Sequence, residues 1–108
     1  MKDNVVYLRH MLDAVNKIAR YVNGVSFETF KNNDMMVDAV VRELEIIGEA
    51  ASKIDLKFRV QNTDVPWKKI VGMRNYLIHE YFGVSKKIVW ETCQSELPEL
   101  KKQILSAI

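Results

Sequence analysis

Apolar residues recur every three or four positions along most of the chain, a pattern typical of helices that bury one face. The first such segment extends over about residues 4–22, and its apolar positions are Val5, Leu8, Leu12, Val15, Ala19 and Val22. Asp3 or Asn4 can cap this predicted helix, because side-chain oxygens accept the free N–H groups of a first turn. Gly24 ends it, since glycine readily adopts the positive φ of a helix C-cap.

A second helical region lies near the middle of the sequence, after a short turn. Ser26 caps a predicted helical turn over residues 26–30, in which two phenylalanines point inward. The longer helix extends over about residues 35–57, with apolar positions at Val37, Val40, Leu44, Ile47, Ala51 and Ile54. Gly48 lies inside this helix, where it costs about 1 kcal/mol relative to alanine. We therefore expect another backbone to approach closely at Gly48.

Two more helices complete the pattern. Residues 58–65 predict a polar connection, and a third long helix extends from Trp67 to about Phe82. The last helix begins at its cap, Ser85, and continues to the C-terminus. Pro98 lies within it and predicts a kink, because proline has no N–H and its ring crowds the preceding turn.

Four long helices and one short helix, joined by short connections, predict an all-α fold. We expect an antiparallel up-and-down helical bundle that forms a single domain over residues 1–108. The sequence has only 4 glycines and 2 prolines, too few for the many tight turns of an all-β domain. Several helices carry two apolar edges, and a bundle of this size often buries the second edge in a dimer.

Composition limits the chemistry that the chain can perform. A net charge of +2 does not by itself indicate a polyanionic partner. The single cysteine, Cys93, excludes an internal disulfide and a cysteine-based zinc site. Only His10 and His79 are present, without metal-binding spacing, so we expect no metal and no cofactor. No apolar run is long enough to span a membrane and no signal peptide is apparent, so we expect a cytoplasmic protein.

Residues 72–83 combine polar side chains with apolar neighbours that would otherwise fill a core. His79 can exchange protons near pH 7, and Arg74 can hold a phosphate through its planar guanidinium group. Together they are a minimal set for phosphodiester cleavage without a metal. The alternative is that Arg74 is a surface charge and His79 a satisfied, partly buried histidine.

The spacing of these two residues constrains how they could act together. His79 follows Arg74 by five positions, which places the side chains about 140° apart around a regular helix. They converge only if the helix ends near His79, or if a second copy of the chain contributes to the same cleft. Asn75 precedes His79 by four positions and shares its face of the helix.

The order of Arg74, His79 and Tyr81 resembles the signature of the HepT-like branch of the HEPN ribonucleases. These are toxins of two-gene, type VII-like toxin–antitoxin systems. The resemblance extends over essentially the whole chain, and the further matching segments are Ser26–Phe30, Ile46–Ala51, Pro66–Trp67, Ile70–Asn75, His79–Val84 and Trp90.

This resemblance implies a HEPN-like helical domain that forms a homodimer, with its active cleft at the dimer interface. It implies that Arg74 and His79 are catalytic and that Asn75 orients the site. The implied reaction is RNA cleavage without a metal, in which the ribose 2′-hydroxyl attacks the adjacent phosphate and leaves a 2′,3′-cyclic phosphate. The implied partner is a minimal nucleotidyltransferase antitoxin, which silences the toxin by attaching AMP to Tyr81.

Other residues have two interpretations each. Glu49 either contacts Arg74 across the bundle and supports the site, or faces solvent. The lysines that flank the motif either hold RNA phosphates or serve as solubilising charges; they are Lys68, Lys69, Lys86 and Lys87. The whole chain also has two alternatives to an enzyme, namely a non-catalytic subunit that presents nucleotide or substrate to a nucleotidyltransferase, and a purely structural dimeric bundle.

Overall fold

The computed structural model describes residues 2–80 and 83–108, and these residues form helices and connections with no strand among them. The elements are α1 (Lys2–Tyr21), α2 (Phe27–Lys31), α3 (Asp34–Ser52), α4 (Leu56–Gln61), α5 (Trp67–His79), α6 (Lys86–Glu91), the π-helical turn η1 (Thr92–Glu96) and α7 (Leu97–Ala107). The predicted all-α class is confirmed.

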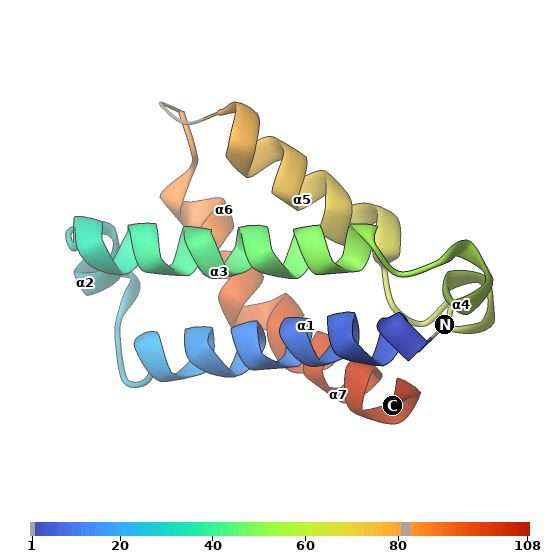
Figure 1. The fold of residues 1–108 in the computed structure, drawn as a ribbon. Coiled ribbons are helices and arrows are strands. Elements are labelled where there is room, and N and C mark those ends of the chain that lie inside the picture. The colour runs from blue at the N-terminus through green and yellow to red at the C-terminus, as the bar shows by residue number, and fades with distance from the viewer. Residues whose placement is uncertain (1, 81–82) are drawn as a thin grey trace.

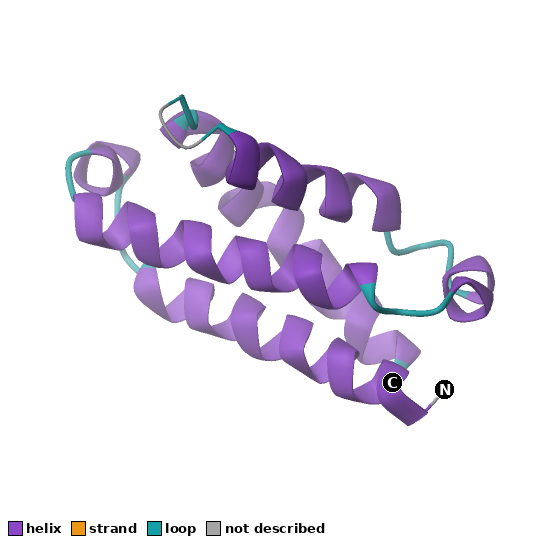
Figure 2. Cartoon of the chain, turned by 45° about the horizontal axis from the view of Figure 1, so that its top comes forward, coloured by secondary structure: helices purple, strands orange, loops and turns teal. Residues whose placement is uncertain are grey.

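Helix α3 is the centre of the arrangement. It lies between α1 on one side and α5 on the other, and the last helices, α6 and α7, cross behind them (Figure 1). The view from a second direction shows the same order, with α4 at one end of the molecule beyond the end of α3 (Figure 2). Each long helix therefore buries one face against its neighbours and leaves the opposite face exposed.

The core consists of apolar side chains from α1, α2, α3, α5 and the C-terminal helices. The largest fully buried ones are Phe30, Leu8, Met11, Ile18, Ile104, Val40 and Val89. The predicted stripe of α1 is confirmed at Leu8, Val15 and Val22, which are buried. Met11 and Ile18 complete the buried face, whereas Val5 is 40% exposed. Burial also raises the pKa of the Cys93 thiol to about 12, so that this side chain is uncharged.

The predicted helix starts are largely confirmed by their caps. The hydroxyl of Ser26 accepts the N–H of Thr29 at 3.1 Å, and that of Ser85 accepts the N–H of Ile88 at 3.2 Å. Gly24 has a φ of 71°, which explains why glycine follows α1. Helix α5 begins at Trp67, as predicted, directly after Pro66.

The helix predicted over residues 35–57 is shorter, and α4 occupies the first half of the predicted polar connection. Helix α3 ends at Ser52 because Arg59 of α4 folds back onto it and donates to the carbonyl oxygens of Ala51, Ser52 and Ile54, each at 3.0 Å. Asp55 caps α4. The N–H of Phe58 bonds to its carboxylate, which lowers the pKa of Asp55 to about 2.

The last two predicted helices also differ in detail. Helix α5 ends at His79, earlier than predicted, and Tyr81 and Phe82 lie outside the described residues. The kink expected at Pro98 takes the form of η1, in which the N–H of Leu97 bonds to the carbonyl of Thr92. Pro98 cannot donate to Gln94, so a wider turn just before it absorbs the missing bond.

Candidate functional site

Arg74 is positioned by a close contact between α5 and α3. A Cβ atom at Gly48 would overlap with the Cβ atom of Arg74, and would lie 2.9 Å from its Cγ atom and 3.2 Å from the carbonyl oxygen of Ile70. The close backbone approach predicted at Gly48 is therefore confirmed. Because no larger residue fits without moving α5, Gly48 fixes where the Arg74 side chain leaves its helix.

The guanidinium group of Arg74 forms an ion pair with Glu49 of α3. Its Nη1 atom donates to Oε1 of Glu49 at 2.6 Å, and Lys53 lies 3.6 Å from the other carboxylate oxygen. The contact with Arg74 is thus the interpretation of Glu49 that the structure supports. The Arg74 side chain is only 21% exposed, and its Nε atom is buried with no hydrogen-bond partner among the described residues. A buried donor without a partner carries a desolvation cost of about 1–3 kcal/mol.

Arg74 and Glu49 line an open groove of about 410 Å³, called here the Arg74 groove. Helices α1, α3 and α5 form its walls, and the other charged or aromatic side chains that line it are Tyr7, His10, Arg42, Glu45 and Lys53. The rings of Tyr7 and His10 meet edge to face, with centroids 6.0 Å apart. Sequence reasoning missed His10, because only the packing of α1 beside α3 places it near Arg74.

His79 is the last residue of α5 and is exposed, and it does not line the Arg74 groove. One of the two conditions for convergence, a helix end near His79, is therefore met. Even so, no contact within the described residues brings His79 to Arg74. Tyr81, the residue expected to receive AMP, lies outside the described residues.

Asn75 faces a different surface from Arg74. It lines an open groove of about 530 Å³, called here the α4–α5 groove, whose lining residues are Ser52, Arg59, Val60, Thr63, Trp67, Lys68, Val71, Gly72 and Asn75. Successive residues of a helix point about 100° apart, which explains why neighbouring side chains reach separate grooves.

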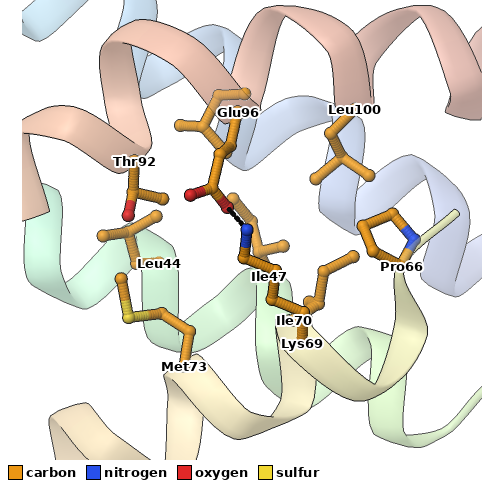
Figure 3. Close-up of a pocket in the computed structure, with 10 residues that line it drawn as sticks. Leu44, Ile47, Pro66, Lys69, Ile70, Met73, Thr92, Glu96 and Leu100 are labelled. Atoms are coloured by element: carbon orange, nitrogen blue, oxygen red, sulfur yellow. Dashed lines mark ion pairs between the residues drawn. The ribbon is translucent and has the colours of Figure 1, made fainter. Parts of the chain in front are cut away.

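The four lysines expected to hold RNA phosphates have different surroundings. Lys68 lines the α4–α5 groove, and Lys87 is exposed. Lys69 forms an ion pair with Glu96 at 3.3 Å across the mouth of a small apolar cavity of about 50 Å³ between α3, α5 and the C-terminal helices (Figure 3). Lys86 donates to the carbonyl of Lys31 at 2.9 Å. Two of the four are therefore already engaged within the chain.

Comparison with known proteins identifies the family of this chain. The model of a family described as "Ribonuclease HepT-like" matches residues 11–107. The chain belongs to the HepT-like ribonuclease family. This membership confirms the resemblance that the motif residues carry.

Several relatives of this HepT-like chain have names that refer to a ribonuclease. It is 48% identical to "Putative RNase TTE0752" of Caldanaerobacter subterraneus subsp. tengcongensis, over 96% of this chain and 93% of that protein. It is 38% identical to "Putative RNase MJ1380" of Methanocaldococcus jannaschii, over 95% and 94% of the two chains. It is 37% identical to "Probable ribonuclease HepT" of Thermococcus cleftensis, over 88% and 86%.

No solved structure matches the chain. Among the described residues, no helix has both the length and the apolar character needed to cross a membrane.

Proposed function

We propose that this HepT-like protein is the toxin of a toxin–antitoxin pair and cleaves RNA without a metal, using Arg74 and His79. The observation that carries the proposal is that Gly48 and Glu49 of α3 hold Arg74 in place, and that α5, the helix that carries Arg74, ends at His79. An arginine held in one place can stabilise charge at one phosphate, and an exposed histidine at a helix end is free to exchange protons.

The proposed reaction uses the nucleophile that RNA itself supplies. His79 takes the proton of the 2′-hydroxyl, the bond from the 2′-oxygen to phosphorus forms, and the bond to the 5′-oxygen breaks. The imidazolium of His79 then gives this proton to the leaving 5′-oxygen, and a 2′,3′-cyclic phosphate remains. Arg74 stabilises the negative charge that builds on the phosphate, and Glu49 positions Arg74.

A homodimer supplies the arrangement that one chain lacks. Arg74 and His79 lie about 140° apart on α5, so a guanidinium and an imidazole meet most readily when they come from two copies of the chain. Ile78 is 43% exposed beside Arg74, and an exposed apolar residue there suits a contact with the second copy. Asn75 lies one turn before His79 and orients the site from the same face.

The central test is cleavage of RNA by the purified protein in the presence of EDTA. The wild-type protein is expected to cut, whereas Arg74→Ala lowers the rate by roughly 10²–10³-fold and His79→Ala by roughly 10²–10⁴-fold. The exposed Lys101→Ala is the matched control and keeps full activity. An inert wild-type protein, or a His79→Ala variant that cuts equally well, contradicts the proposal and favours the non-catalytic subunit.

We further propose that a minimal nucleotidyltransferase antitoxin silences the toxin by attaching AMP to Tyr81. A bulky anionic group two positions after His79 would block the site and repel the phosphates of RNA. With the antitoxin and ATP, the wild-type protein is expected to gain the mass of AMP and lose its activity, whereas Tyr81→Phe gains none. Intact-mass measurement decides the matter, and AMP on the Phe variant would assign the modification to another residue.

A further inference from the structure

The α4–α5 groove differs in charge from the other cavities near α5. Two cations, Arg59 and Lys68, line it, and none of the described residues that line it is acidic. The Arg74 groove, by contrast, includes Glu45 and Glu49, and the cavity below Lys69 includes Glu96. The guanidinium group of Arg59 already donates to the carbonyl oxygens at the end of α3, so the charge that is left for an anion in this groove is that of Lys68. In the other two cavities, carboxylates offset part of the positive charge.

Gly72 leaves the backbone of α5 accessible from this groove. It lies in the middle of α5, where glycine is among the least favourable residues, and a Cβ atom built there meets nothing within 4 Å. Gly48 shows what a helical glycine accommodates in this fold, namely the close approach of another group. No described part of the chain occupies the equivalent space at Gly72, so a molecule outside the chain can approach the backbone there.

The walls of the groove combine apolar and polar surfaces. Val60 is 64% exposed and lines the groove together with Val71 and Trp67. The indole N–H of Trp67 donates to the carbonyl of Asn62 at 3.0 Å, which holds the ring in place. Thr63 and Asn75 add hydrogen-bonding groups to its lining. Apolar side chains with hydrogen-bonding groups and a cation beside them suit an unpaired nucleotide.

We propose that the α4–α5 groove binds one unpaired nucleotide of the RNA substrate, with its base against Val60 and Val71 and its phosphate near Lys68. Gly72 lets the sugar–phosphate backbone lie close to α5. Asn75 lies about 6 Å along the helix axis from His79, so the bound strand continues directly to the proposed catalytic residue. This inference rests on the proposed function and adds a subsite to it.

The exposed apolar residues of α4 would also suit a protein, including a second copy of the chain. Lys68, for which the described lining residues provide no carboxylate, favours an anionic occupant, because a protein surface gains little from unpaired charge. The test is therefore designed to separate the two.

Binding is measured separately from cleavage, with the full-length His79→Ala protein and a short, unstructured, fluorescently labelled RNA. Val60→Glu and Lys68→Glu are each expected to weaken binding by roughly tenfold or more, and Lys68→Glu to reduce the dependence of affinity on salt. Leu105→Glu and Lys101→Glu make the same chemical changes on α7 and are expected to leave the affinity unchanged. Gly72→Ala is expected to raise the melting temperature and lower the affinity.

The outcomes separate this inference from the proposed function. RNA binding that is absent, or that is unchanged by Val60→Glu and Lys68→Glu, overturns the subsite. A Val60→Glu variant that loses RNA binding only because it no longer dimerises, as measured by analytical ultracentrifugation, also overturns it and assigns the groove to a protein interface. A wild-type protein that binds RNA through Val60 and Lys68 but does not cut it overturns the proposed function and leaves the subsite intact.

Discussion

At the scale of single residues, one arginine is held by two neighbours of different kinds. Gly48 acts by having no side chain, so that the stem of Arg74 can rest on α3, and Glu49 acts through a 2.6 Å ion pair. The Glu49 side chain is about half exposed, so the contribution of this ion pair to the free energy of unfolding is modest. Its effect is to fix the direction of the guanidinium group.

Substitution of Gly48 tests this steric role. Gly48→Ala is expected to destabilise the protein by about 1–3 kcal/mol, because the added methyl group forces α5 away from α3, which outweighs the gain in helix propensity. Gly72→Ala is the matched control, since the same change in an open position of a helix is expected to stabilise by up to about 1 kcal/mol. Urea denaturation measures both, and a Gly48→Ala variant as stable as the control would contradict the close contact.

Some contacts of single residues could be predicted from the sequence, and others could not. The tight fit at Gly48 could be predicted because a glycine inside a helix needs a steric reason. The position of His10 could not, because it depends on how α1 lies beside α3 rather than on any motif. Asn75 adjoins Arg74 in sequence, yet the turn of the helix directs the two side chains into separate grooves.

At the scale of elements, periodicity predicted where the long helices lie and caps predicted where several of them start. The ends were harder, because they depend on partners elsewhere in the chain. Helix α3 stops at Ser52 because Arg59 binds its last carbonyl groups, and Arg59 itself lies in a helix where a loop was predicted. The turn η1 arises from Pro98, but the residues that absorb the missing hydrogen bond precede the proline.

At the scale of the whole molecule, the exposed surface of α5 has two parts with different proposed roles. One side of it, which extends from Trp67 to Asn75, lines the α4–α5 groove, which we assign to the RNA strand. Its end, with Ile78 and His79, is the region that we assign to contact with a second copy. Family membership supports a ribonuclease, whereas the composite site is a proposal that depends on the pairing of two chains.

The most direct test of that pairing is to mix the two inactive variants. Arg74→Ala and His79→Ala proteins are denatured together, refolded as a mixture and assayed for RNA cleavage in EDTA beside each variant refolded alone. If each cleft combines Arg74 of one subunit with His79 of the other, each mixed dimer regains one of its two sites. Because about half of the dimers are mixed, the mixture recovers about a quarter of the wild-type activity. A mixture that forms mixed dimers and stays as inactive as its components would contradict the account.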